Sequence, residues 1–535
     1  MKKSVFALIM AIVMLFSLVA CGPAKPVETQ PQENKPAETQ PQSQSATKPI
    51  SQGEDLTFKK NISIAHHQAN VAIGPQDTGS GMQKLLGFLQ FNSLTIFDQE
   101  AKKVVGRLAE SFSAEEGGKV WTFVLKQGIK FHNGEELEAD DVLYTYERAM
   151  EKGKNTSKWT KFIEAIEIVD KYTVRFVLNA PNMDFGFTMT DYCASILNRE
   201  ANEADPENGY GIGTGAWKLK EFIPNDHAVY ERFDDCFLWD EIGSMNPTET
   251  ITVYYMADQN TRMIGVQAGD LDIGCIANNG EFYNYQQMDG VEPVIAASWS
   301  LDYVGMNPNC EYFQDENVRK AVAYAIDKDE ALEVINNGFG LTCKSFWCPD
   351  TIGYTENFSE NYSFNLEKAK EYLAKSAYPN GFTVTLTTIN AYSLYAETVQ
   401  AQLARIGINC EVNLTDSPGM STAGKDGSLQ IYIWNSTISP YGDYLTQTIT
   451  STGSGNYAHF TNEKIDELMA AAVSEPDEAK RAEMYQQVQE ELNNDCYLVP
   501  MFFGYLSNLT RDNVEGYMFT SEGYYLWNVR AVEEG

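Results

Sequence analysis

The sequence predicts a mixed α/β body of several domains. Segments in which apolar and polar residues alternate are interspersed with segments in which apolar residues recur every three or four positions, and these patterns indicate strands and helices. From residue 54 onward the composition is that of a globular protein, with 43% apolar residues in the whole sequence. About 480 residues exceed the roughly 250–300 at which a single core usually divides, so two or three domains are expected.

Residues 1–20 have the features of a secretory signal peptide. Lys2 and Lys3 precede an apolar run over residues 5–19, which is shorter than the ~18 or more apolar residues that indicate a membrane span. Residues 18–22, Leu-Val-Ala-Cys-Gly, resemble the lipobox of bacterial lipoproteins. The resemblance implies that Cys21 becomes the first mature residue, carries lipid and anchors the protein to the extracytoplasmic face of the cell membrane. An ordinary signal peptide with a chance cysteine is the alternative.

The segment that follows has the composition of a tether. Residues 22–53 are mainly Pro, Gln, Glu, Thr, Ser and Lys. Such a segment buries too little apolar surface to offset its ordering entropy, and its prolines keep it extended. We predict a lipidated cysteine and disordered linker over residues 21–53, so that a chain beginning near Glu54 keeps its fold.

The net charge and the cysteines limit the classes of partner. A formal net charge of −34 argues against nucleic-acid binding and against a basic patch that grips anionic lipid. Of nine cysteines, Cys343 and Cys348 are close enough in sequence to form a disulfide across a loop, and two independent buried thiols are the alternative. No paired CxxC elements of the zinc-binding kind occur.

Four strands and four helices are the clearest predicted elements. Apolar residues alternate with polar ones, as in half-buried strands, over residues 121–125, 174–178, 382–387 and 410–414. Apolar faces with helical spacing cover residues 366–373, 395–406, 465–472 and 482–492. Gly407 is placed to end the second of these helices as a C-cap glycine.

No motif in the sequence indicates catalysis. The five histidines, none in HExxH spacing, are His66, His67, His132, His227 and His459. Adjacent strand residues point to opposite faces, so His66 and His67 are predicted to be a surface pair rather than metal ligands. The glycine-rich residues 211–215 precede a strand-like segment and lack the spacing of a dinucleotide fingerprint. We predict no enzyme activity, no cofactor and no bound metal.

Six motif blocks follow one another along the chain, at residues 120–142, 213–219, 262–273, 307–328, 456–466 and 499–500. The first block contains Gly-Ile-Lys-Phe-His-Asn-Gly at residues 128–134, and the third contains Gln-Ala-Gly-Asp-Leu-Asp-Ile at residues 267–273. Together and in this order, the six blocks resemble the signature of bacterial extracellular solute-binding proteins of family 5, the peptide- and nickel-type receptors of ABC importers.

The resemblance implies a two-lobed periplasmic-binding-protein-like fold of type II, in its three-domain peptide-binding variant, with a hinge and a ligand cleft. It also implies a division of the chain. Domain I of the first lobe would comprise residues 54–92, 213–300 and 501–535, the inserted domain II residues 93–212, and domain III, which forms the second lobe, residues 301–500.

The function implied by the resemblance is capture of an extracytoplasmic ligand by lobe closure and its delivery to the membrane permease of an ABC importer. Oligopeptide is the first ligand class, and a nickel chelate or another small solute is the alternative within the family. Two further classes stay open: an exported lipoprotein hydrolase and a sensor that does not transport. The implied partners are the ligand, the permease subunits and the membrane through the lipid anchor, and the chain is expected to be a monomer.

The implied ligand-binding residues come from two segments. In peptide-type members a strand ending in Trp enters the cleft, and an Asp three residues later anchors the amino terminus of the peptide. Trp434 matches that Trp, but Thr437 replaces the Asp, and Asn435 lies between them. A buried ammonium needs a charged partner, so this departure weakens the peptide assignment. The alternative for Trp434 is a place in the core, and Asp443 is the nearest acidic residue that would substitute for the missing Asp.

On the opposite lobe, the segment before the predicted Phe91 helix supplies backbone contacts in the family, and here it contains Gly79, Ser80 and Gly81. Glycines let a ligand approach the main chain closely. Several aromatic residues lie in segments that could border the cleft: Trp299, Tyr303, Tyr392, Tyr395, Tyr441 and Tyr444.

Overall fold

The computed structural model describes residues 46–49, 56–69, 72–77, 81–98, 100–154, 156–206, 209–349, 351–438, 443–520 and 523–533. The chain separates into two compact units, residues 1–41 and 42–535, and all described residues belong to the second. The predicted signal peptide and Cys21 therefore lie outside the described residues, as do Gly79 and Ser80.

An eleven-stranded mixed sheet runs through the described body. One further strand, β13 (Leu341–Thr342), pairs with β17 off the main path. In spatial order the others are β15 (Ile408–Thr415), β14 (Phe382–Ile389), β16 (Ile431–Thr437), β12 (Val291–Met306), β17 (Leu498–Arg511), β11 (Ile273–Ile276), β1 (Asn61–His66), β10 (Thr250–Tyr255), β9 (His227–Arg232) and β8 (Trp217–Ile223).

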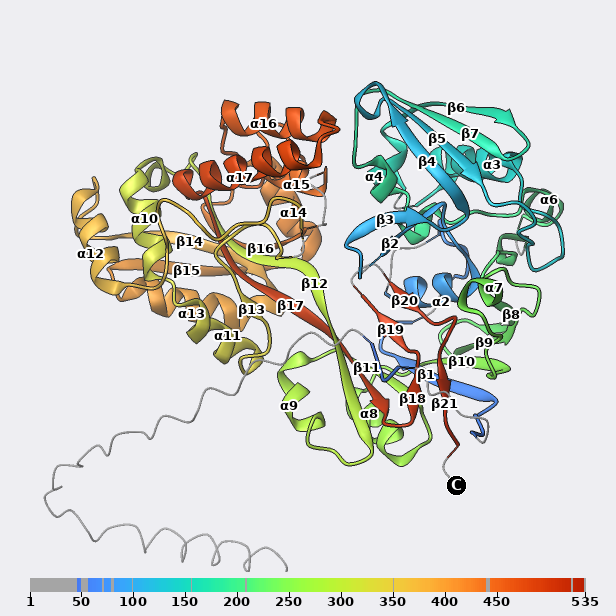
Figure 1. Cartoon of the computed structure of the whole chain (residues 1–535). Coiled ribbons are helices and arrows are strands. Elements are labelled where there is room, and N and C mark those ends of the chain that lie inside the picture. Colours follow the sequence, from blue (N-terminus) through green and yellow to red (C-terminus); the bar gives the residue numbers. More distant parts are fainter. Residues whose placement is uncertain are drawn as a thin grey trace, which may run out of the picture. The chain divides into compact units, whose positions relative to one another are not determined.

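Two long antiparallel strands, β12 and β17, join the halves of this sheet (Figure 1). Their register is regular from Val291 to Ala297, then shifts between Ala297 and Leu301 and again between Asp302 and Tyr303. On one side of the first shift β17 pairs with β11, and on the other side β12 pairs with β16. Because a bulge bends a strand and breaks the ladder, the two halves meet at residues 298–300.

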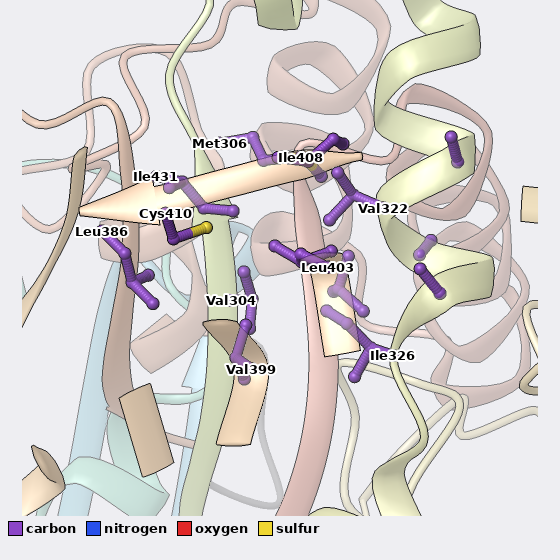
Figure 2. Close-up of a cluster of buried hydrophobic side chains, with 14 of the residues drawn as sticks. Val304, Met306, Val322, Ile326, Leu386, Val399, Leu403, Ile408, Cys410 and Ile431 are labelled. Carbon is purple, nitrogen blue, oxygen red and sulfur yellow. The ribbon is translucent and has the colours of Figure 1, made fainter. Parts of the chain in front are cut away.

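Helices flank the second half of the sheet, which contains β14, β15 and β16. Figure 2 shows part of the core there, where Val304 and Ile431 of the sheet lie with Val399 and Leu403 of a helix. Burying each such side chain contributes about 1.5–3 kcal/mol. The helices of this half are α10 (Glu316–Ala325), α11 (Lys328–Asn336), α12 (Leu366–Lys375), α13 (Ser393–Ala404), α14 (Ser417–Asp426), α15 (Asp443–Ile449), α16 (Glu463–Ser474) and α17 (Glu478–Asp495).

A separate four-stranded antiparallel sheet has the order β4 (Ala109–Glu115), β5 (Val120–Leu125), β7 (Thr173–Leu178) and β6 (Ile163–Asp170). Phe123 and Phe176 lie on its buried face, where their rings pack edge to face, and Tyr146 of α3 covers them. The shorter paired strands are β2 (Thr95–Asp98) with β3 (Lys103–Gly106), β18 (Val514–Glu515) with β21 (Arg530–Ala531), and β19 (Met518–Phe519) with β20 (Tyr524–Tyr525).

The remaining helices are α2 (Gly81–Gln90), α3 (Ala139–Lys152), α4 (Ser157–Thr160), α5 (Phe185–Thr188), α6 (Arg199–Ala204), α7 (Leu238–Ile242), α8 (Gln259–Ala268) and α9 (Phe282–Tyr285). Within the described ranges, every helix falls short of the length or the apolarity that a membrane crossing requires.

The elements predicted from periodicity are confirmed. The four predicted strands are β5, β7, β14 and β15, and the four predicted helices are α12, α13, α16 and α17. Gly407, just beyond α13, has a φ of 89°, as expected for a glycine that ends a helix. Cys343 and Cys348 are both buried and are not joined by a disulfide, so the alternative of two independent thiols holds.

The predicted spacer extends too far along the chain. Thr47 is buried, its backbone N–H donates to the Tyr517 carbonyl (2.9 Å), and its hydroxyl accepts from the Tyr517 N–H (3.0 Å). Isolated β-bridges join Ala46 to Met518 and Lys48 to Glu515. A segment poor in large apolar side chains can thus attach by backbone hydrogen bonds, which composition does not reveal. Residues 46–49 belong to the body rather than to the spacer.

Candidate functional site

A cavity of about 460 Å³ lies at the junction between the halves of the large sheet. Its lining comes from the ends of β1, β11 and β16, from the shifted residues 298–300 of β12, from β17 and from the β19–β20 hairpin. Ligand sites favour concave junctions of this kind. A second cavity, beside Lys328, holds only about 30 Å³, and a wider groove of about 750 Å³ beside Lys126 is a charged surface depression away from the junction. The junction cavity, called the pocket below, is the candidate site.

Trp299 forms the centre of the junction. It lines the pocket and is 8% exposed, and its ring packs edge to face on Phe97 of β2 (centroids 6.1 Å apart) and against Phe187 of α5 (5.8 Å). The Trp299 carbonyl accepts a hydrogen bond from the Ile438 N–H. Trp299 therefore ties the shifted part of β12 to the end of β16 and to the segment that carries β2 and α5.

The three site residues predicted on β16 are not equally placed. Thr437 is exposed and lines the pocket. Trp434 is half-buried and packs at a tilt on Tyr457 (centroids 6.2 Å apart), and it is not part of the pocket lining. The Asn435 amide donates to the Tyr392 hydroxyl (2.9 Å), which donates to Asp302 (2.9 Å). Of these residues only Thr437 reaches the pocket, and a ligand-binding role for each stays a prediction.

The glycine segment predicted on the opposite side falls mostly outside the described residues. Gly81 is the first residue of α2, and Lys84 in the next turn lines the pocket. Among the predicted aromatic candidates, Trp299 lines the pocket, whereas Tyr303 and Tyr395 are buried in the apolar clusters. Tyr441 lies outside the described residues.

His66, His67 and Cys275 form the wall opposite Thr437. His66 is the last residue of β1 and is 3% exposed, and its ring stacks on that of His67 with centroids 4.6 Å apart and planes at 22°. The prediction of a surface pair on opposite faces is therefore wrong. Strand alternation ends at His66 because a bend follows it, so both rings turn to the same side. Cys275 of β11 places its Sγ 3.4 Å from His67 Nδ1.

Burial and a nearby cation set the charges on this wall. Burial first, and then the neighbouring His67 and Arg262, together lower the pKa of His66 to about 3. Burial and Arg262 also lower the pKa of His67, so both imidazoles are neutral at pH 7. Arg262 of α8 is buried and donates to the carbonyl groups of Cys275 (2.9 Å), Ala257 (2.9 Å) and Met256.

The Cys275–His67 contact resembles a thiol nucleophile with its base, but its electrostatics are those of an inert thiol. Reactive cysteines have a lowered pKa in a partly exposed, electropositive setting. Burial raises the pKa of Cys275 to about 12, against the smaller opposing effects of Arg262 and the His67 backbone N–H. Cys275 is also only 8% exposed. The pair is thus suited to binding rather than to nucleophilic attack.

The rest of the described lining combines apolar and aromatic side chains, among them Ile276, Leu506 and Phe519, with polar ones, and it carries no carboxylate. Besides the cation Lys84, it offers hydroxyl and amide groups from Ser298, Ser300, Asn279, Ser507, Asn508 and Thr520. Such a surface can hydrogen-bond a polar ligand and can balance negative charge. His66 and Cys275 are more than 200 residues apart, so no sequence motif connects them. The two adjacent histidines were the one feature of this cluster that the sequence showed.

Comparisons with known proteins agree with this architecture. The model of the family "Bacterial extracellular solute-binding proteins, family 5 Middle" matches residues 103–459. The chain is 24% identical over 474 residues to heme-binding protein A of Haemophilus influenzae, covering 81% of this chain and 85% of that protein. It is 23% identical over 481 residues to the dipeptide-binding protein of Escherichia coli K12, covering 83% and 89%.

The solved structure of HbpA2 from Haemophilus parasuis superposes with a TM-score of 0.81 at 24% identity, over 89% of this chain and 100% of that one. This likeness confirms the predicted fold class, a type II periplasmic-binding-protein-like fold.

Proposed function

The chain belongs to the bacterial extracellular solute-binding proteins of family 5, and from this premise we propose that it is the substrate-binding protein of an ABC importer. It captures a peptide-like ligand outside the cytoplasm and delivers it to the membrane permease. The observation that carries the proposal is the pocket at the register shift of β12 and β17, where the two halves of the large sheet meet.

The geometry of the junction is suited to capture by closure. Among the described strands, only β12 and β17 continue through the register shift, and a bulge bends the strand that contains it. A rotation about this pair moves the β1–β11 wall toward Thr437 and narrows the pocket. Hinge closure around a ligand is a common way in which a few residues absorb a large domain motion.

A second candidate is a receptor for a neutral or anionic solute, including a metal chelate such as a nickel chelate. The family relatives described above are named for a dipeptide and for heme, so the family alone does not select a ligand. The observation that favours this candidate is the replacement of the ammonium-binding Asp by Thr437, in a pocket whose described lining carries Lys84 and no carboxylate. A free peptide amino terminus would lack a charged partner on these residues.

We also propose that Cys21 carries the lipid anchor and that the chain acts as a monomer. The support is the lipobox-like segment at residues 18–22. Two acyl chains give stable anchoring where one is marginal. Cys21→Ser is expected to release the protein from the membrane fraction or to leave the precursor unprocessed. A variant that fractionates and migrates like the parent would contradict the anchor.

The test of the function is mass spectrometry of whatever co-purifies with the protein and is released by mild denaturation. A released peptide supports the first candidate, and a non-peptide solute supports the second. Titration of the emptied protein with the identified compound, followed by isothermal calorimetry, should saturate without chemical change in that compound. Conversion of the compound by pure protein would favour the hydrolase alternative, and normal uptake by a deletion strain would favour a sensor.

A further inference from the structure

The wall formed by His66, His67 and Cys275 has the chemistry of a metal site. One ligand atom from each residue lies within 4.8 Å of the other two. Two imidazoles and a thiol select borderline and soft transition metals over magnesium or calcium, which prefer oxygen ligands. The set comes from two neighbouring parallel strands, since β1 pairs with β11 at Ile64 and Ala65.

The distance between Cys275 Sγ and His67 Nδ1 matches that of two ligands bound to one zinc ion, and the remaining distances of the group are within 4.8 Å. With Zn–S near 2.3 Å and Zn–N near 2.0–2.1 Å, the sulfur and nitrogen of a tetrahedral zinc site lie about 3.5 Å apart. Cys275 Sγ and His67 Nδ1 are 3.4 Å apart. The Gln68 N–H donates to His66 Nδ1 (3.1 Å), so this nitrogen presents a lone pair, which a metal would take over from that hydrogen bond.

We propose that His66, His67 and Cys275 bind a transition-metal ion of the zinc type, with one coordination position open to the pocket. Sites with three protein ligands and one open position are those that also bind an exogenous ligand. All three residues line the pocket, so the open position faces the ligand space. The metal site goes beyond the proposed function. Whether these three residues bind a metal does not depend on whether the chain serves an importer.

The protonation state of each ligand fits this assignment. Metal-bound histidine is neutral, and the lowered pKa values of both histidines keep them neutral at pH 7. Cys275 must lose its proton to solvent when the metal binds, and Arg262 and the His67 backbone N–H both favour its thiolate.

Arg262 also repels a cation, and this repulsion shapes the site. The thiolate offsets one unit of the combined positive charge of a divalent ion and Arg262, which leaves a net positive wall. The open position therefore favours an anionic donor, such as a carboxylate or thiolate of the cargo. This last point rests on the proposed function, whereas the three protein ligands do not.

The direct test is binding of Zn²⁺ alone to the purified full chain, stripped with a chelator and kept reduced. We expect about one equivalent of Zn²⁺ per chain and release of about one proton per ion near pH 7, from Cys275. Co²⁺ in the same site should give a thiolate-to-metal charge-transfer band, which requires a sulfur ligand. Absence of stoichiometric Zn²⁺, or Co²⁺ bound without this band, would overturn the site.

Matched variants locate the ligands. Cys275→Ser and His67→Ala are each expected to weaken Zn²⁺ binding at least about 100-fold, since loss of a supporting residue alone commonly costs 10–100-fold. Cys410→Ser, another buried thiol, and His227→Gln, a histidine beside Asp226, are the controls and should bind like the parent. Unchanged binding in Cys275→Ser would refute the assignment. If that variant fails to fold, the proton release and the Co²⁺ band of the parent decide.

The outcomes separate the two proposals. A stripped protein that captures its ligand but binds no Zn²⁺ overturns the metal site and leaves the importer function standing. A protein that binds Zn²⁺ through Cys275 but captures no solute and supports no uptake would support the metal site and overturn the importer function.

Discussion

The wall of the pocket built by β1 and β11 (the first wall) holds its ionisable groups in one cluster, whereas the described residues of the wall at the end of β16 (the second wall) include no charged side chain. His66, Cys275 and Arg262 are each less than a tenth exposed and contact one another or a shared backbone segment. On β16, Thr437 is exposed, and Asn435 is engaged with Tyr392. The motif that resembles the family's ligand-binding strand therefore lies on the second wall. The ionisable groups of the first wall come from residues outside that motif.

The two walls also differ in how they are held. Arg262 fixes the β11 side through three carbonyl groups, so loss of any one ligand of that wall leaves the backbone in place. The end of β16 depends on Trp299 at the register shift. Substitutions in the first wall should change the charge of the pocket and the pH dependence of stability. Substitutions at the junction should change the free energy of unfolding.

The largest expected effect is that of Trp299→Ala. Trp299 fills the junction between Phe97 and Phe187, and loss of a buried tryptophan costs about 3–5 kcal/mol of unfolding free energy. Trp434→Ala is the matched control; its half-buried ring should cost only about 1–2 kcal/mol. Urea denaturation measures both, and a larger loss in Trp434→Ala would show that β16 rather than the junction holds the second wall.

The second-largest expected effect is the pH dependence of stability that His66 in the first wall produces. The pKa of His66 is about 3 in the folded protein against about 6.5 when unfolded, so the unfolded chain binds the proton first as pH falls. The stability that neutral His66 contributes is thus fully present above about pH 6.5 and is lost toward pH 3, at about 1.4 kcal/mol per unit. His66→Gln should lack this slope.

Urea unfolding of parent and His66→Gln between pH 7 and pH 4 gives the difference directly. Other buried groups, such as His132 and Asp302, contribute equally to both proteins, so their effects cancel. Parallel pH profiles would mean that the first wall does not hold His66 in its neutral form.

Thr437→Asp tests whether the cargo binds at the second wall by adding a negative charge there. A cargo with a free amino terminus near this position should bind about 1.5–3 kcal/mol more tightly through a charged hydrogen bond, and an anionic cargo should bind more weakly. Because Thr437 is exposed, the melting temperature of the empty protein should be nearly unchanged. Thr437→Asn, similar in shape without the charge, is the control. Equal ligand affinity in all three proteins would place the cargo away from β16.

The smallest expected effect concerns the strand pairing behind the first wall. Residues 46–48 pair with the segment that contains β18 and β19, and Phe519 of β19 lines the pocket. A chain that begins at residue 54 loses the three Thr47–Tyr517 hydrogen bonds, each worth about 0.5–1.5 kcal/mol. It should melt a few degrees below a chain that begins at residue 42. Identical melting curves would show that these contacts do not stabilise the body.

The sequence alone predicted four strands, four helices and the family. Alternation in β5 and β14 and the helical spacing in α13 are set by which face of each segment is buried, and that periodicity is readable without knowing the partner. Six ordered blocks identified the family, and the Thr at position 437 was visible as a departure within the strand.

Only the tertiary structure decided which side chains meet in the pocket. His67 and Cys275 are 208 residues apart and come together because β1 pairs with β11, and no local pattern records that pairing. The register shift beside Trp299 arises from the match between two long strands, β12 and β17, rather than from either strand alone. Thr47 joins the body through backbone hydrogen bonds, which any residue can make and composition cannot reveal. The periodicity of a segment shows which of its faces is buried. A site depends on which segments are neighbours in the fold, and the packing of the whole chain determines those neighbours.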